Sequence, residues 1–166
     1  MPKQHRAMLI GAIGAGKSTL TNALLGRKQP AVKTQALSYQ DWIVDTPGEY
    51  TENPMFYKNL MATALEVTHI LFIQDATNSK PVFPPGFATG IPKLAIGVVT
   101  KVDAPGADGA RAAVQLRQAM PTGPILLVSA YTGEGLEHIR SLVECANYLQ
   151  MKEYCLNSKS INISDM

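Results

Sequence analysis

Short apolar runs alternate with amphipathic segments along this chain of 166 residues. The apolar runs predict buried strands over residues 6–11, 67–74, 94–99 and 125–128. Apolar residues recur at helical spacing over residues 16–25, 53–66, 107–120 and 134–152. Because strands that alternate with helices build a parallel sheet between helical layers, we expect a mostly parallel α/β sheet covered on both faces.

Capping residues and apolar stripes refine the helix predictions. The first helix should end at Gly26, a C′ glycine, and Asn53 followed by Pro54 predicts the start of the second. The buried stripe of the second helix is expected to consist of Tyr57, Leu60, Met61, Ala64 and Leu65. The inner face of the closing helix is expected to consist of Leu136, Ile139, Leu142, Val143, Ala146 and Leu149.

Two segments are expected to depart from the alternation of strands and helices. A strand at 35–39, a tight Gln40-Asp41 turn and a strand at 42–44 predict one antiparallel hairpin, with Trp42 packed in the core. Residues 76–92 hold four prolines and predict an irregular connection. Within it, the loop 83–87 either docks a partner through its two phenylalanines or packs down on the sheet.

Composition limits the classes of function. A chain with 46% hydrophobic residues and net charge +2 has enough apolar residues for one domain, which we place at 1–155, before a disordered tail at 156–166. The scattered basic residues favour no nucleic-acid partner, and no apolar run predicts membrane insertion. Cys145 and Cys155 lack metal-ligand spacing and should be reduced thiols, so we expect a cytoplasmic protein.

The strongest chemical signal is the octet at residues 11–18, GAIGAGKS, which matches the phosphate-binding pattern G-x-x-x-x-G-K-[ST]. It follows an apolar strand directly and opens a predicted helix, as such a loop must. Glycines let the backbone turn its N–H groups toward phosphate oxygens. Phosphates are therefore expected on Gly11, Gly14, Ala15, Gly16, Lys17, Ser18 and Thr19.

A second motif, D-x-x-G, follows the hairpin strand at Asp45-Thr46-Pro47-Gly48. Lys17 would pair with the β- and γ-phosphates, and the Gly48 N–H would meet the γ-phosphate. Mg²⁺ is expected on Ser18, Thr34 and Asp45. Thr34 lies in the loop before the hairpin, where it either closes on the metal or is simply a hydroxyl at a strand edge.

A third motif concerns the base. Residues 100–103, TKVD, end a predicted strand and match [NT]-K-x-D. The Asp103 carboxylate can accept from guanine N1–H and N2–H₂, whereas adenine offers it no such donors. Thr100 and Lys101 would fix the loop and cover the base, and a backbone N–H at Ser129-Ala130 would donate to guanine O6. The alternative is a loop capped by a solvated aspartate.

Taken together, the octet, Lys33-Thr34-Gln35-Ala36, the run DTPGEY at 45–50, the loop 83–87 and TKVD resemble the EutP/PduV family over about residues 6–145. The resemblance implies a P-loop NTPase fold, a Ras-like three-layer α/β/α sandwich. It also implies a bacterial protein of ethanolamine or propanediol utilisation, with microcompartment shell or pathway proteins as partners and a place at the organelle.

The predicted hydrolytic residues are Lys17, Thr34, Gly48 and Glu49. Glu49 stands where Ras-type enzymes carry the glutamine that orients water, and its charge would face an anionic γ-phosphate. No arginine is placed as a finger, so we expect slow turnover unless another protein activates it.

Three classes of function stay open at this point. The first is a GTP-binding protein with slow Mg²⁺-dependent hydrolysis, which the guanine-type Asp103 favours. The second, known as a proposal for ethanolamine members of the family, is an ATP-dependent acetate kinase. The third is a nucleotide-loaded binding module with negligible turnover.

Overall fold

Among the residues that the structure describes, seven strands form a single sheet in the order β2-β3-β1-β4-β5-β6-β7. The computed structural model describes residues 5–28, 36–158 and 163–164. The strands are β1 (Ala7–Ile10), β2 (Ser38–Gln40), β3 (Ile43–Asp45), β4 (His69–Asp75), β5 (Leu94–Thr100), β6 (Ile125–Leu127) and β7 (Ile163–Ser164). Strands β3, β1, β4, β5 and β6 are parallel, and β2 and β7 run antiparallel at the two edges. The predicted parallel sheet and hairpin are confirmed, and β7 adds an antiparallel edge that was not predicted.

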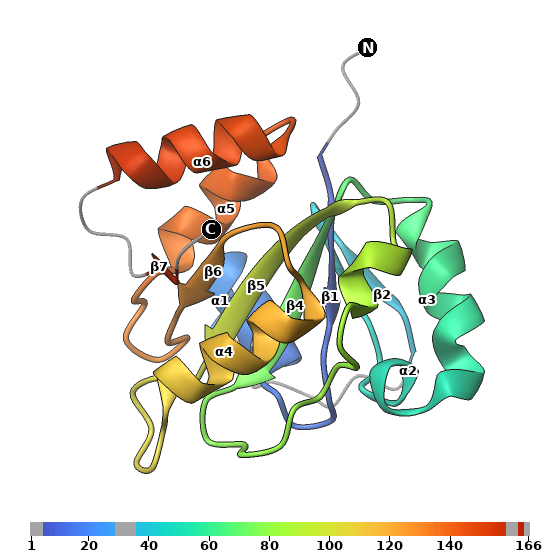
Figure 1. Ribbon diagram of the computed structural model, residues 1–166, viewed down its shortest axis with the longest axis horizontal. Coiled ribbons are helices and arrows are strands. Elements are labelled where there is room, and N and C mark those ends of the chain that lie inside the picture. The colour runs from blue at the N-terminus through green and yellow to red at the C-terminus, as the bar shows by residue number, and fades with distance from the viewer. Residues whose placement is uncertain (1–4, 29–35, 159–162, 165–166) are drawn as a thin grey trace.

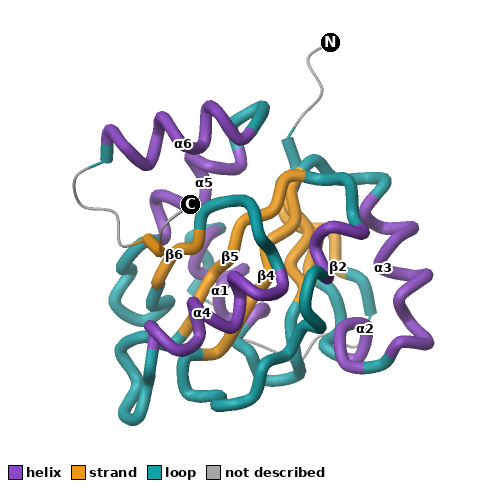
Figure 2. Tube along the Cα trace, in the orientation of Figure 1, coloured by secondary structure: helices purple, strands orange, loops and turns teal. Residues whose placement is uncertain are grey.

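Helices cover both faces of the sheet. They are α1 (Lys17–Leu24), α2 (Glu49–Glu52), α3 (Tyr57–Ala64), α4 (Gly109–Ala119), α5 (Leu136–Val143) and α6 (Tyr148–Asn157), with short 3-10 turns η1 (Pro54–Phe56) and η2 (Phe87–Gly90). Side chains from α3 and α4 share one apolar core, and those from α1, α5 and α6 share the other. Figures 1 and 2 show α4 in front of the sheet and α1 behind it, which makes three layers.

Strand alternation explains how one sheet supplies both cores. In β1, Met8 and Ile10 enter the core under α3 and α4, while Ala7 and Leu9 enter the core under α1 and α5. All four side chains are fully buried, which is why the strand reads as a continuous apolar run.

The proline-rich connection 76–92 is irregular apart from η2, as predicted. Its aromatic rings face inward: Phe83 is buried, with its ring centroid 5.3 Å from that of Phe72, and Phe87 lies 5.7 Å from Phe83. Of the two alternatives for the loop 83–87, the structure shows the packed one.

The single closing helix predicted over 134–152 is wrong. Two helices occupy this stretch, and Asn147 caps the start of α6, where its side chain accepts from the Gln150 N–H at 2.9 Å. The break changes the phase of the apolar stripe. Leu149 and Ala146 are therefore exposed, and Met151 and Cys155 face the core instead. Cys145 and Cys155 are free thiols, as expected.

Other boundaries also shift. Asn53 caps the turn η1 by accepting from the Met55 N–H at 3.0 Å, so α3 is short, and Met61 and Leu65 lie on its exposed side rather than in the predicted stripe. Gly26 ends α1 with a positive φ of 67°, as predicted.

The hairpin turn and the tail differ from the predictions as well. Because Gln40 pairs with Ile43, the turn residues are Asp41 and Trp42, one position later than predicted. Trp42 is buried, and the Arg140 guanidinium lies 4.6 Å from its ring centroid. In the segment expected to be a disordered tail, α6 continues to Asn157 and β7 pairs with β6. No helix in the described ranges is long and apolar enough to cross a membrane.

His69, the first residue of β4, is joined by a hydrogen bond to the chain just after α5. Its side chain is fully buried, and its Nε2 lies 2.9 Å from the Cys145 carbonyl oxygen. Burial, opposed by that hydrogen bond, lowers the pKa of His69 to about 4. The imidazole is therefore neutral in the folded protein at pH 7.

This shift predicts a dependence of stability on pH. Between pH 6.5 and about 4 the unfolded chain protonates His69 and the folded chain does not, so stability is lost as the pH falls through that window. The loss attributable to His69 should reach about 3 kcal/mol. Urea unfolding of wild type and His69→Gln at pH 7 and pH 4.5 checks it, since the variant should lose clearly less stability. An equal loss in both proteins would contradict the assignment.

Candidate functional site

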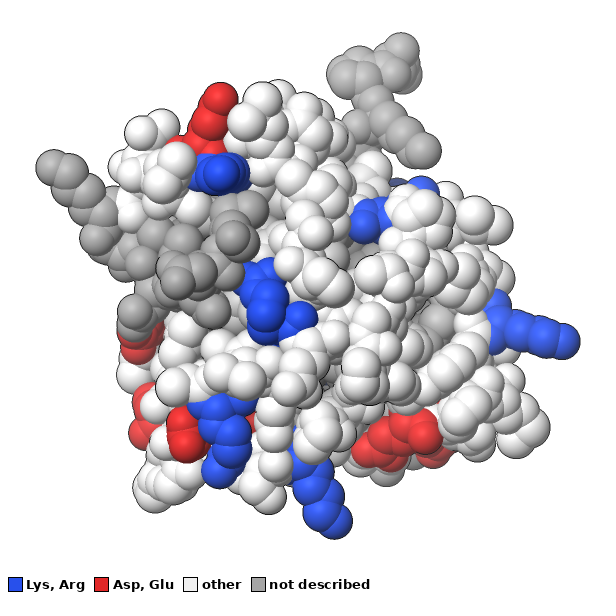
Figure 3. All heavy atoms as spheres, viewed as in Figure 1, with Lys and Arg blue, Asp and Glu red and all other residues white. Residues whose placement is uncertain are grey.

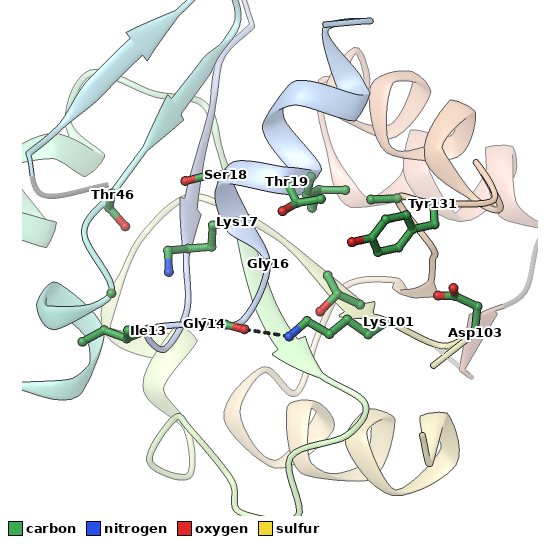
Figure 4. A pocket seen from close by; sticks show the side chains of 14 residues that line it. Ile13, Gly14, Gly16, Lys17, Ser18, Thr19, Thr46, Lys101, Asp103 and Tyr131 are labelled. Atoms are coloured by element: carbon green, nitrogen blue, oxygen red, sulfur yellow. Dashed lines mark hydrogen bonds between the residues drawn. The ribbon is translucent and has the colours of Figure 1, made fainter. Parts of the chain in front are cut away.

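A cleft of about 420 Å³ lies at the carboxyl ends of the strands (Figure 4). The loop after β1 and the start of α1 contribute Ile13, Gly14, Gly16, Lys17, Ser18, Thr19 and Leu20. The loops after β3, β5 and β6 contribute Thr46, Gly48, Thr100, Lys101, Asp103, Ala130 and Tyr131. The structure thus brings ten of the predicted residues to one cleft. Ligands of open parallel sheets bind at this edge.

The loop 11–16 passes into α1 through a left-handed glycine. Gly16 has φ 97° and precedes the first helical residue, so a side chain there would be strained. Gly11, expected to supply the same freedom, serves differently: a Cβ there would lie 2.9 Å from the Ile73 carbonyl oxygen, so this glycine allows close packing on β4. Gly11 and Ala15 are buried beneath the cleft rather than lining it.

Lys17 is held inside this loop. Its Nζ donates to the carbonyl oxygens of Gly11 and Ala12, each at 2.9 Å, and the residue is almost fully buried. Burial lowers the pKa of Lys17, and the carboxylates of Asp45 and Glu52 oppose that shift. An ammonium group enclosed by a glycine-rich loop provides a site for an anion.

A hydrogen bond between two side-chain oxygens joins the end of β3 to the start of α1. The Ser18 hydroxyl donates to Asp45 Oδ2 at 3.0 Å, and Asp45 is buried. Next to it, Thr46 donates to the Leu9 carbonyl at 2.6 Å, which fixes the chain as it leaves β3. A hydroxyl and a carboxylate side by side suit Mg²⁺, which takes oxygen ligands. Thr34, the third predicted ligand, lies outside the described residues.

The TKVD loop is fastened to the phosphate loop by two hydrogen bonds. Thr100 Oγ1 donates to the Ala15 carbonyl at 2.7 Å, and Lys101 Nζ donates to the Gly14 carbonyl at 2.8 Å (Figure 4). The same ammonium forms an ion pair with Asp75 at 2.8 Å. Burial raises the pKa of Asp75, but hydrogen bonds from Lys101 and Thr77 outweigh it, so this pKa lies below its ordinary value. Asp75 was not predicted as part of the site.

Asp103 is exposed at the end of the cleft away from Lys17, at the same end as Tyr131 (Figure 4). Ser129, which follows β6, is fully buried. Its N–H donates to the Glu134 carbonyl at 3.1 Å, and its Oγ accepts from the Thr132 N–H at 3.1 Å. Of the predicted Ser129-Ala130 pair, only Ala130 lines the cleft.

The D-x-x-G glycine packs directly on the phosphate loop. A Cβ at Gly48 would lie 2.5 Å from the Ile13 backbone nitrogen, so no larger residue fits without moving the chain. Glu49 follows as the first residue of α2, is exposed and does not line the cleft. Its role in hydrolysis stays a prediction.

Two residues of α2 reach the phosphate loop without having been predicted. Thr51 Oγ1 accepts from the Gly11 N–H at 3.0 Å, and Glu52 Oε1 accepts from the Ile13 N–H at 3.2 Å. Neither belongs to a recognised motif, and the sequence holds no periodic pattern that predicts a helix of four residues.

The fold defines a class of protein. The solved structure of Era in complex with MgGDPNP and nucleotides 1506–1542 of 16S ribosomal RNA superimposes with a TM-score of 0.61. At 24% identity, the match covers 84% of this chain and 56% of that one. The fold is that of the P-loop GTPases.

Sequence comparison gives the family. The profile of the PduV-EutP family, described as "Ethanolamine utilisation - propanediol utilisation", matches residues 4–145, so the chain belongs to that family. The "Probable acetate kinase EutP" of Salmonella typhimurium is 35% identical over 150 residues, which cover 89% of this chain and 92% of that protein. The "tRNA modification GTPase MnmE" of Thermus thermophilus is 31% identical over 159 residues, 85% of this chain but 33% of MnmE.

Proposed function

We propose that this protein binds GTP with Mg²⁺ and hydrolyses it slowly. The observation that carries the proposal is the fastening of the TKVD loop to the phosphate loop through Thr100 and Lys101. These bonds fix Asp103, the base-reading carboxylate, relative to Lys17, the phosphate-binding cation. A ligand with phosphates at one end and a base that offers hydrogen-bond donors at the other would suit this arrangement.

At the phosphate end, Lys17 and the N–H groups of residues 14–19 would hold the triphosphate. Lys17 would exchange its present bonds to the Gly11 and Ala12 carbonyls for phosphate oxygens. Ser18 and Asp45, with Thr34 as a third proposed ligand, would hold Mg²⁺, which supplies charge neutralisation of the phosphates. The adjacent oxygens of Ser18 and Asp45 support this assignment.

At the base end, Asp103 would accept two hydrogen bonds from guanine. Adenine would set a lone pair against the carboxylate, and this mismatch favours GTP. The Lys101 stem would lie along one face of the base. Ala130 would donate its N–H to O6, and Tyr131 lies at the same end of the cleft (Figure 4).

Hydrolysis is proposed to be slow because Glu49 stands where Ras-type enzymes carry the glutamine that orients water. Glu49 is exposed at the start of α2, and no arginine lines the described cleft. A carboxylate near the γ-phosphate adds repulsion where the transition state needs stabilisation. An activating protein would therefore raise turnover strongly.

Glu49→Gln is expected to leave GTP affinity within about threefold and to preserve or raise the rate of hydrolysis, since an amide orients water without adding charge. Single-turnover phosphate release measures the rate, with Glu153→Gln on α6 as a control for loss of one exposed carboxylate. A fall of about a hundredfold or more would show that Glu49 acts as an essential base.

A second candidate function comes from the relatives named probable acetate kinase. The kinase would transfer the γ-phosphoryl group of ATP to acetate. To test it, the protein is incubated with ATP or GTP, with and without acetate, and acetyl phosphate is trapped as the hydroxamate. Our proposal predicts phosphate from GTP and no acetate-dependent product. Acetyl phosphate formed from ATP would establish the kinase, and tight GTP binding without phosphate release would establish a binding module.

Membership of the family supports a proposal for the pathway and the cellular location of the protein. We propose that the protein acts in ethanolamine or propanediol utilisation, in the cytoplasm at a microcompartment, and contacts shell or pathway proteins. Fractionation of cells grown on each compound checks this, because the protein should sediment with the organelle. Recovery in the soluble fraction alone would contradict the proposed location.

A further inference from the structure

Helix α2 attaches to the phosphate loop at both of its ends. At its start, Gly48 packs against Ile13 so closely that a Cβ would lie 2.5 Å from the Ile13 nitrogen. At its end, Thr51 and Glu52 accept hydrogen bonds from the N–H groups of Gly11 and Ile13. The four-residue helix thus lies over the part of the loop nearest to D-x-x-G.

The contact made by Glu52 differs in kind from that made by Thr51. Thr51 supplies a neutral oxygen to a buried N–H, which satisfies a backbone donor beneath the cleft. Glu52 brings a carboxylate to the amide of Ile13, a residue that lines the cleft. Its charge also acts on Lys17, where it favours the ammonium form and raises the pKa. An anionic group of the protein therefore stands beside the site meant for an anionic ligand.

We propose that Glu52 is a specificity-determining residue that disfavours the γ-phosphate and so shifts the preference of the protein toward the diphosphate. The inference rests on the proposed function, because it concerns guanine nucleotides in this cleft. In that function, Gly48 meets the γ-phosphate, and Glu52 lies on the helix that Gly48 begins. The α- and β-phosphates lie further along, toward residues 16–19.

Repulsion between the Glu52 carboxylate and the γ-phosphate determines the direction and the size of the expected change in affinity. The third phosphate adds negative charge near Ile13, where the Glu52 carboxylate already is. Like charges within several ångströms at a protein surface repel by an amount worth about five- to tenfold in affinity. In the proposed function the diphosphate would not extend to this end of the cleft, so its affinity should be nearly independent of Glu52.

Glu52→Gln tests this directly, because glutamine keeps the shape and an oxygen that can accept from Ile13. Dissociation constants are measured for Mg²⁺-GDP and for a Mg²⁺-bound GTP analogue that resists hydrolysis, in wild type, Glu52→Gln and the control Glu153→Gln. The analogue should bind Glu52→Gln about five- to tenfold more tightly than wild type, while GDP affinity stays within about twofold. The control should match wild type, and salt near 1 M should shrink the difference, since it screens exposed charges.

The outcomes separate this inference from the function on which it rests. A change of equal size for both nucleotides would mean that Glu52 only supports the loop, and no change would mean that its charge is not felt. Either result overturns the inference and leaves GTP binding standing. Absence of guanine-nucleotide binding in the wild type would overturn both. Thermal unfolding of each variant confirms that all proteins compared are folded.

Discussion

Asp103→Asn should weaken GTP binding by at least about 2 kcal/mol, which corresponds to a factor of about thirty in the dissociation constant. The carboxylate can accept from both N1–H and N2–H₂ of guanine with charge assistance, whereas an amide presents one acceptor. Asp103 is exposed, so the fold should tolerate the change. Calorimetric titration with GTP and GDP measures the loss.

The same variant should gain affinity for xanthine nucleotides. Xanthine carries a carbonyl where guanine has its amino group, so the asparagine NH₂ meets an acceptor that the carboxylate repels. Asp108→Asn is the matched control, because Asp108 is an exposed aspartate that caps α4 away from the cleft. If GTP affinity is unchanged in Asp103→Asn and xanthine nucleotides do not gain, Asp103 does not read the base.

Lys17→Ala should abolish measurable triphosphate binding, a loss of more than about a hundredfold, because its ammonium is buried against the Gly11 and Ala12 carbonyls, where the phosphates are proposed to bind. The fold should persist, since the ammonium of Lys17 donates to backbone carbonyls of its own loop. Circular dichroism and thermal unfolding check the fold, and Lys152→Ala on α6 controls for the loss of one exposed lysine. GTP binding near wild-type affinity would contradict the assignment of the phosphate loop.

The strands were predictable because each central strand is buried on both faces. Met8, Ile10, Ala7 and Leu9 divide between two cores, and this double burial requires the continuous apolar runs that the sequence displays. The closing helix was not predictable in the same way. Apolar spacing continues across residues 143–148, and only the capping geometry of Asn147 reveals that a new helix begins there with a different phase.

Some residues of the site could likewise be predicted from the sequence, and others could not. Lys17, Asp45 and Asp103 stand in motifs whose spacing is dictated by the ligand, so the sequence alone indicates them. Glu52 and Asp75 act through tertiary contacts, with a loop amide in one case and with Lys101 in the other. No spacing in the sequence encodes such contacts, because they depend on how the loops after different strands pack against one another. The hydrogen bond from the Ser129 N–H to the Glu134 carbonyl could not be predicted for the same reason.

The central claim, that this cleft selects guanine nucleotides, is tested most directly by calorimetric titration of the wild-type protein with GTP and with ATP in the presence of Mg²⁺. The account predicts that GTP binds at least about a hundredfold more tightly than ATP, because adenine faces the Asp103 carboxylate with no donor to offer. Equal affinity for the two nucleotides would contradict it, and acetate phosphorylation from ATP would then become the leading interpretation.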